Sequence, residues 1–215
     1  MFPKSLTIPK DQLQTVSENT TIQEVYDLLS QPENAHTRSF PVLDESGQLF
    51  RGNVYRQHIF EQMAKGGDMS LPVTAIMRNS TKFIFTNSQF YDVFFAIRDL
   101  PFIAVLDENH HFYGIFTHDA LMDVLAQSWS LEEGGVAIAL LSQQTRGDLE
   151  KMSKIITRFT NIESVVTLQT EPKDPITVMF TLPLTIDSPD LKKLVAKLEK
   201  KGYPVQSLEN LAQFK

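Results

Sequence analysis

One pattern occurs twice in the chain, and it constrains the fold more than any other feature of the sequence. Residues 104–125 read as an apolar strand, an acidic turn, a second strand that ends at Thr117, and a helix. Residues 41–63 repeat this order with the same Val-Leu-Asp-Glu at the turn. The spacing of about 62 residues is too long for a solenoid. We therefore expect two similar repeats that pack face to face, because one alone buries too little apolar surface.

Each repeat is predicted to run strand, helix, strand, strand, helix. In the first repeat, residues 21–24 read as a capping box that starts a helix. Strands are expected at 40–43 and 48–55, and the second helix runs from Arg56 to about residue 65. Residues 4–16, before the repeat, are predicted to be extended.

The second repeat is predicted to begin with a helical turn at 71–77 and a strand at 83–85. A helix capped by Asn87 or Ser88 follows and continues through Ile97. The final helix opens at residues 117–119. Its apolar spacing predicts a buried side made of Leu121, Met122, Val124 and Leu125.

The charge balance changes along the chain. Residues 1–134 carry 9 Lys and Arg against 17 Asp and Glu, a balance of −8, whereas residues 135–215 carry 11 against 9, a balance of +2. This shift predicts a domain boundary near Gly134 and Gly135. It also argues against nonspecific nucleic-acid binding, which needs a broad basic face.

Composition excludes several classes of protein. The chain has no cysteine, so it has neither disulfides nor thiolate metal sites. The first residues lack a secretory hydrophobic segment, and the longest apolar run, 136–141, is too short to span a bilayer. We expect a soluble cytoplasmic protein without a membrane segment.

The last part of the chain predicts a βαββαβ order, as in a ferredoxin-like fold. A helix is expected at 148–159 with Leu149, Met152, Ile155, Ile156 and Phe159 inward, and a second one starts with Ser188 as cap and Pro189 at the first position. The four strands are predicted at 136–141, 162–168, 176–182 and 203–208.

Residues 5–127 resemble a CBS domain pair, also called a Bateman module. The resemblance is carried by Phe-Pro-Val-Leu-Asp at 40–44 with Gly-Asn-Val-Tyr at 52–55, and by Ile-Ala-Val-Leu-Asp at 103–107 with Gly-Ile-Phe-Thr at 114–117. Residues 135–211 resemble an ACT domain, through Arg-Gly-Asp-Leu at 146–149 and Asn-Ile-Glu at 161–163. The implied fold class is α/β (α+β), with CBS repeats at 1–66 and 67–128, a linker at 129–134 and an ACT-like domain at 135–215.

This combination resembles the cyclic di-AMP-binding CBS proteins of Gram-positive bacteria, and also the acetoin-utilisation AcuB-like proteins. The string at 50–55 favours the first group. The resemblance implies a bacterial, homodimeric regulator without catalysis or a resident cofactor, which binds an adenine nucleotide and signals to an unknown protein partner. The alternatives are an AMP- or ATP-binding regulator and a structural or oligomerisation adaptor that binds no nucleotide.

The resemblance places the nucleotide in the cleft between the repeats. Adenine needs an apolar slot beside backbone polar groups, and phosphates favour helix N-termini and arginines. The predicted nucleotide-binding residues lie at the starts of two strands and two helices: Arg38, Ser39, Phe40, Pro41, Tyr55, Arg56, His58, Phe102, Ile103, Ala104, Thr117, His118 and Asp119.

The sequence departs from the AMP- and ATP-binding members at two positions of the motif. Those members carry an Asp three residues after the Thr, where it grips the ribose, but here that position is His58 in the first repeat and Ala120 in the second. Tyr55 replaces the Thr in the first repeat. The departure favours a cyclic dinucleotide over a mononucleotide, and it also permits a site that has lost binding.

Other candidate sites are weaker. Gly147 and Asp148 form a possible ACT effector loop, although Arg146 stands where a Pro is usual, and many ACT domains only dimerise. His110 and His111 have no third ligand at a suitable spacing, so no metal site is predicted. No set of side chains suggests catalysis.

Overall fold

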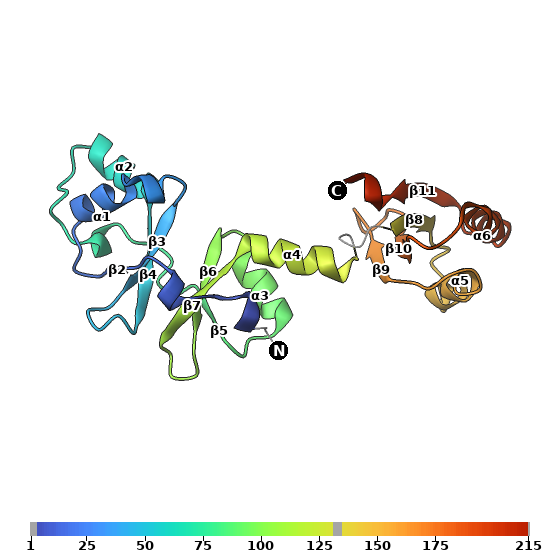
Figure 1. Ribbon diagram of the computed structural model, residues 1–215, viewed down its shortest axis with the longest axis horizontal. Coiled ribbons are helices and arrows are strands. Elements are labelled where there is room, and N and C mark those ends of the chain that lie inside the picture. The colour runs from blue at the N-terminus through green and yellow to red at the C-terminus, as the bar shows by residue number, and fades with distance from the viewer. Residues whose placement is uncertain (1–3, 131–134, 215) are drawn as a thin grey trace. The chain divides into compact units, whose positions relative to one another are not determined.

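The structure is a computed structural model that describes residues 4–130 and 135–214. The chain divides into two compact units, Met1–Leu121 (unit 1) and Met122–Lys215 (unit 2), and each is described by itself (Figure 1). The described residues form two sheets in unit 1 and one in unit 2. No helix among them is long and apolar enough to cross a membrane.

The first repeat is a three-stranded sheet with two helices. Its strands are β2 (Val16–Ser17), β3 (Ser39–Leu43) and β4 (Phe50–Tyr55), and its helices are α1 (Ile22–Leu29) and α2 (Arg56–Ala64). Alternate residues of the strands reach the helices, and the resulting core contains Phe40, Val42, Val54, Ile22, Val25, Leu29 and Ile59. The predicted capping box is confirmed, since the Thr21 hydroxyl accepts from the Glu24 N–H at 3.2 Å and the Glu24 carboxylate accepts from the Thr21 N–H at 2.8 Å.

The second repeat has the same order of elements. It contains β5 (Phe83–Phe85), α3 (Phe90–Ile97), β6 (Phe102–Leu106), β7 (Phe112–Thr117) and α4 (His118–Ser128), with a 3-10 turn at Val73–Ala75 before β5. The order strand, helix, strand, strand, helix is therefore confirmed in both repeats.

The two repeats pack sheet against sheet, as the duplication predicts. Leu43 of β3 lies in one apolar cluster with Phe102, Ala104, Leu106, Phe112 and Ile115 of the second repeat. The rings of Phe50 and Phe112, which occupy matching positions in the repeats, stack with 5.9 Å between centroids and 15° between planes. The Phe112 N–H donates to the Gln48 carbonyl at 2.7 Å. Stacking of aromatic rings at matched positions thus helps to set how the two repeats are aligned on each other.

Each repeat also lends a backbone segment to the other. The short strand β1 (Ile8–Pro9), at the start of the first repeat, pairs with β7 of the second, while Arg78, which precedes β5 in the second repeat, pairs with Asn53 of β4. Both crossings pass over a glycine. A Cβ on Gly114 would overlap the Ile8 carbonyl oxygen, and one on Gly52 would lie 2.8 Å from the Arg78 carbonyl oxygen. The glycine of the repeated motif is therefore required by close approach of two backbones.

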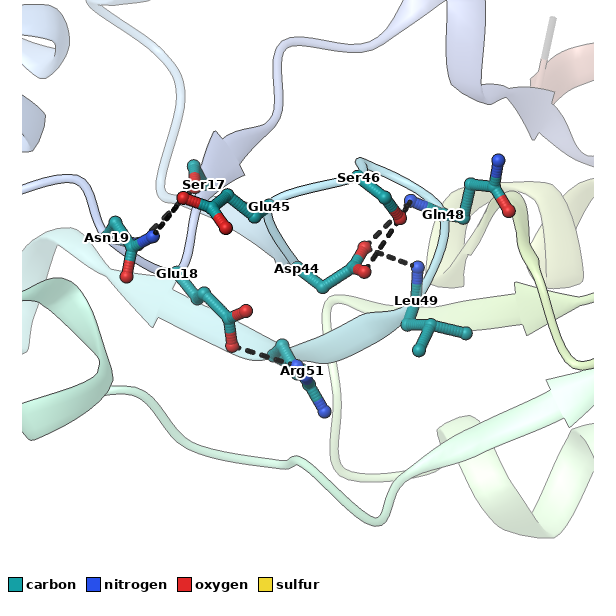
Figure 2. Close-up of polar contacts among 9 residues, drawn as sticks. All are labelled: Ser17, Glu18, Asn19, Asp44, Glu45, Ser46, Gln48, Leu49 and Arg51. Carbon is teal, nitrogen blue, oxygen red and sulfur yellow. Dashed lines mark hydrogen bonds and ion pairs between the residues drawn. The ribbon is translucent and has the colours of Figure 1, made fainter.

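The acidic turns of the repeats are closed by their own carboxylates. In the first turn, Asp44 accepts from the N–H groups of Gln48 and Leu49, each at 2.8 Å, and from the Ser46 hydroxyl at 2.7 Å (Figure 2). These bonds, led by the one from Leu49, lower the pKa of Asp44 to about 2. In the second turn, Asp107 accepts from the N–H groups of Asn109 and His111 at 2.8 and 2.9 Å. The matched aspartates thus stabilise the two turns by accepting hydrogen bonds from the backbone of each turn.

Three expectations for the two repeats are wrong in detail. Residues 4–16 are not continuously extended, because 3-10 turns at Lys4–Leu6 and Lys10–Gln12 flank β1. The N-cap of α3 is Gln89, because the Ser88 hydroxyl instead accepts from the Phe85 N–H at 2.9 Å. Met122 is 47% exposed, since it lies about 100° around α4 from the buried Leu121.

Unit 2 has the predicted βαββαβ order. It comprises β8 (Gly135–Leu141), α5 (Asp148–Ile156), β9 (Ser164–Leu168), β10 (Thr177–Pro183), α6 (Ser188–Lys200) and β11 (Val205–Asn210). The sheet is antiparallel with the order β11-β8-β10-β9, which is the ferredoxin-like arrangement that the ACT resemblance implies. Its core joins strand residues such as Ile138 and Phe180 to Met152 of α5 and Leu194 of α6.

Some details of unit 2 differ from expectation. Leu149 is 47% exposed, and α5 ends at Ile156, before the predicted residue 159. The cap of α6 is Asp187, whose carboxylate accepts from the Asp190 N–H at 2.7 Å, so Ser188 is already helical. The last strand begins at Val205, because residues 203–204 lead into it. Residues 131–134 of the predicted linker lie outside the described residues, and the predicted domain bounds stay a prediction.

Candidate functional site

A cleft with a volume of about 1000 Å³ lies at the start of α2 in unit 1. We call it the α2 cleft. It is lined by Arg38, Tyr55, Arg56, Gln57, His58, Phe60, Glu61, Ala64, Arg78, Asn79, Asp99, Leu100 and Pro101. Both repeats contribute to it, and three arginines face two carboxylates, Glu61 and Asp99. The lining therefore combines apolar surface with a local excess of positive charge.

The start of α2 has no side-chain cap. Tyr55 occupies the N-cap position, but its hydroxyl accepts from the Asn79 amide at 2.6 Å instead of from the helix backbone. The Arg56 N–H donates to the Arg38 carbonyl at 2.8 Å. The remaining N–H groups of the first turn have no capping side chain, and they carry the positive end of the helix dipole. This helix end is suited to an anionic group.

Arg56 lies in the lining, but its guanidinium has other partners. Its Nε donates to the Thr37 carbonyl at 3.0 Å, and its Nη2 donates to the carbonyls of Leu29 and Asn34 at 3.0 and 2.7 Å. In contrast, no partner is found for the Arg38 guanidinium within residues 4–130, and Arg38 is exposed. Of the two predicted arginines, Arg38 is the one with free donors.

Two buried polar atoms near this cleft have no hydrogen-bond partner among the described residues. They are Nδ1 of His58 and Oδ1 of Asn53, a residue that is 1% exposed. The His58 ring lies edge-on to Tyr55, with 5.5 Å between ring centroids. His58 occupies the position of the family's ribose-binding Asp, so a carboxylate is replaced there by an imidazole.

A second cleft of about 560 Å³ lies at the start of β3. It is lined by Gln12, Leu13, Gln14, Glu33, Asn34, His36, Thr37, Arg38, Ser39, Phe40, Pro41, Pro101, Phe102 and Ile115. Five predicted residues occur in this β3 cleft, but Phe40 and Phe102 are only 2% and 7% exposed. Those two side chains belong to apolar cores, so they leave mainly backbone to the cleft.

The other predicted residues lie outside both linings. Ile103 and Ala104 are buried, at 1% and 0% exposure. Thr117 caps α4, because its hydroxyl oxygen accepts from the Ala120 N–H at 3.1 Å. The His118 N–H donates to the Pro101 carbonyl at 2.9 Å. The structure thus places Arg38, Tyr55, Arg56 and His58 in the α2 cleft, and it does not bring Thr117, His118 or Asp119 to either lining.

Sequence reasoning missed Arg78 and Asn79, which reach the α2 cleft from the segment of the second repeat that precedes β5. Arg78 arrives there because its backbone pairs with Asn53, through hydrogen bonds of 2.8 Å in both directions. The available signal was its place directly after the helical turn at 73–77, where the chain must return to the first repeat.

The predicted effector loop of unit 2 lines a cavity of about 520 Å³, together with Met152, Thr167 and Ile176. Gly147 is the N-cap of α5 with φ +80°, a conformation that favours glycine. The Asp148 carboxylate turns inward and accepts from Ser142 Oγ at 2.5 Å, Gln143 N–H at 2.8 Å and Tyr203 Oη at 2.8 Å.

Burial raises the pKa of Asp148, but these hydrogen bonds outweigh burial and hold it below its ordinary value. Burial and the neighbouring carboxylate raise the pKa of Tyr203 to about 12. The side chain of Asp148 is therefore engaged in hydrogen bonds inside unit 2. Amino-acid binding at this loop stays a prediction.

Comparison with known proteins bears on the first repeat and on the fold of unit 1. Residues 5–65 match the CBS domain family. No curated protein matches the chain. Among solved structures, a CBS domain protein from Streptococcus pneumoniae TIGR4 is 18% identical with a TM-score of 0.51, and the match covers 58% of this chain and 86% of that one.

Two further structures show the same fold. CbpB in complex with c-di-AMP is 17% identical with a TM-score of 0.51, over 59% of this chain and 85% of that one. A CBS domain-containing protein of unknown function from Bacillus anthracis str. Ames Ancestor is 19% identical with a TM-score of 0.50, over 59% and 94%. The family match therefore shows a CBS domain at residues 5–65, and the order of elements in that domain occurs a second time in unit 1.

Proposed function

We propose that the chain is a non-catalytic regulatory protein whose CBS pair senses an adenine nucleotide in the α2 cleft. One observation carries the proposal. Arg38 of the matched CBS domain and Arg78 of the following segment line a cleft of about 1000 Å³ at a helix start without a side-chain cap. Arginine guanidinium groups and free helix N–H groups both bind phosphate, and the apolar part of the lining suits a purine.

Cyclic di-AMP is the ligand that this cleft favours over AMP or ATP. The cleft lies at the upper end of the usual size for small-molecule sites, about 300–1000 Å³, so it has room for two linked nucleotides. No carboxylate stands at position 58 to grip a mononucleotide ribose. The similarly folded CbpB is described in complex with c-di-AMP, which supports the same ligand class here.

Isothermal titration calorimetry with cyclic di-AMP, AMP, ATP and S-adenosylmethionine tests the proposal. We expect heat from cyclic di-AMP. Because each cleft arginine supplies charge-assisted hydrogen bonds, Arg38→Ala and Arg78→Ala should each weaken the affinity about tenfold.

Arg51→Ala is the matched control, since Arg51 pairs with Glu18 at 2.9 Å and is not in the cleft lining (Figure 2). Absence of heat with all four compounds would remove the proposal. Wild-type affinity in both cleft variants would move the site elsewhere.

The alternative is a structural or oligomerisation adaptor, and one surface favours it. Helix α3 exposes Tyr91 and Phe95, which are 73% and 68% exposed and one helical turn apart. Exposed aromatic pairs of this kind are typical of protein interfaces. Light scattering of the wild type and of Phe95→Glu tests whether this face joins the proposed homodimer. An adaptor would assemble through it and give no heat with nucleotides.

A further inference from the structure

Arg56 ties together the whole loop that precedes β3. Its guanidinium donates to carbonyls at three places: the end of α1 at Leu29, the 3-10 turn at Asn34, and Thr37 next to the strand. Its N–H donates to the Arg38 carbonyl at 2.8 Å. One residue at the start of α2 therefore fixes the backbone on both sides of Arg38. The buried Asn34 side chain strengthens this loop by donating to the Leu28 carbonyl at 3.0 Å.

The second repeat shows that the fold does not need this arginine. His118 and Pro101 occupy the positions of Arg56 and Arg38, as the registers Phe102↔Thr117 and Ser39↔Tyr55 show. The His118 N–H donates to the Pro101 carbonyl at 2.9 Å, so the junction of strand and helix forms in the same way. The three side-chain bonds of Arg56 are additional to that shared bond, and they occur in the repeat that carries an arginine at position 38.

The loop also differs in length between the repeats. Nine residues, 30–38, separate α1 from β3, whereas four residues, 98–101, separate α3 from β6. A longer loop has more conformations, and an arginine at its end would sample many of them without a constraint. The guanidinium hydrogen bonds of Arg56 restrict the conformations of this loop, because a planar guanidinium binds several acceptors in fixed directions.

We propose that Arg56 is the positioning residue for Arg38: it holds residues 34–38 so that the free Arg38 guanidinium faces a phosphate of the nucleotide in the α2 cleft. The inference rests on the proposed function and gives the two arginines different roles. Arg38 contacts the ligand, and Arg56 acts through Arg38. The four hydrogen bonds of Arg56 and the absence of a partner for Arg38 within residues 4–130 support this division.

A double-mutant cycle tests the proposal by titrating cyclic di-AMP into Arg38→Ala, Arg56→Lys and the variant with both changes. Lysine keeps the charge but cannot donate to the same three carbonyls in the geometry of a guanidinium. We expect each single variant to weaken binding about tenfold, and the double variant to be no weaker than either single one, because both remove the same contact. The slope of affinity against salt should fall equally in the three variants, since each loses the Arg38–phosphate attraction.

The control for general destabilisation is Ile59→Val, a core change in the same helix at a residue that is 1% exposed. It should lower the melting temperature while leaving affinity and salt slope unchanged. Wild-type affinity in Arg56→Lys would overturn the proposal. A hundredfold loss in the double variant would also overturn it, because additivity means that the residues act independently.

A measurement without ligand separates this inference from the proposed function. If the wild type binds no nucleotide, the proposed function fails, and hydrogen exchange of the free protein still decides the positioning role. Arg56→Lys should speed exchange of the Thr37 N–H, which donates to the Asn34 carbonyl at 2.9 Å, while Ile59→Val should not. Unchanged exchange at residues 34–38 would overturn the positioning role.

Discussion

Gly114 lies in β7 of the second repeat, at the point where β1 of the first repeat pairs with that strand. A methyl group there would overlap the Ile8 carbonyl oxygen and lie 3.0 Å from Cα of Pro9. We expect Gly114→Ala to lower the free energy of unfolding by about 1–3 kcal/mol, because neither backbone can move without breaking the pairing of β1 with β7. Urea unfolding measures this.

Gly67→Ala is the control for that substitution. A Cβ at Gly67 would meet only the end of the Gln62 side chain, which can turn away. A loss of stability in Gly67→Ala as large as in Gly114→Ala would show that glycine replacement itself, and not the crossing, is responsible.

Asp44 predicts a specific response to acid. Its pKa of about 2 in the folded state lies below its ordinary value of 3.8, so folding favours the ionised form. Its contribution to stability is therefore complete above about pH 4 and is lost as the pH falls from about 4 to about 2. Asp44→Asn should lower the melting temperature at pH 6, and the difference from the wild type should shrink toward zero as the pH falls through about 2.

Glu108→Gln is the matched control for this charge change, since Glu108 is exposed in the corresponding turn of the second repeat. A difference between Asp44→Asn and the wild type that is the same at pH 6 and pH 2 would contradict the role given to the Asp44 carboxylate.

The types of residue at the clefts could be predicted from the sequence, but the hydrogen-bond partners of their side chains could not. Arg38 and Arg56 were equivalent in the sequence, and only the structure shows that the Arg56 guanidinium donates to three carbonyls, whereas the Arg38 guanidinium has no partner among the described residues of unit 1. Thr117 was predicted to bind the nucleotide, and in the structure its hydroxyl oxygen caps a helix. A side chain's role depends on which acceptor it reaches first, and that is set by packing.

At the scale of elements, long periodic segments were predictable and short crossing segments were not. The longer strands and helices have apolar patterns that can be recognised in a single sequence. Their predicted order is confirmed in both units. The strand β1 has two residues and the bridge at Arg78 has one, so neither has a period. The bridge at Arg78 nevertheless brings Arg78 and Asn79 to the α2 cleft.

The Thr117 cap leads to a prediction for α4. Thr117→Ala removes the acceptor for the Ala120 N–H and should cost about 1 kcal/mol of stability, whereas Thr117→Ser keeps the hydroxyl and should cost much less. Chemical denaturation of both variants checks this. If nucleotide affinity falls in Thr117→Ala but not in Thr117→Ser, the hydroxyl has a ligand contact in addition to its cap.

At the scale of the molecule, two units have separate cores. The apolar clusters of unit 1 and that of unit 2 share no residue. The chain's single tryptophan, Trp129, belongs to unit 2, where its carbonyl accepts from the hydroxyls of Ser164 and Thr181 at 3.1 Å each. Tryptophan fluorescence therefore reports the unfolding of unit 2, while circular dichroism reports both units.

Cyclic di-AMP at about 100 times its Kd should stabilise unit 1 by about 2.7 kcal/mol, which is a shift in melting temperature of roughly 10 °C for a unit of this size. Because the proposed site lies in unit 1, the shift should appear in circular dichroism and be absent from the Trp129 transition. GMP, which the proposal does not include as a ligand, is the control and should move neither transition. A single transition that both probes follow and the nucleotide shifts as a whole would mean that the units unfold together, since a ligand that binds one unit can stabilise the other only through a coupling free energy.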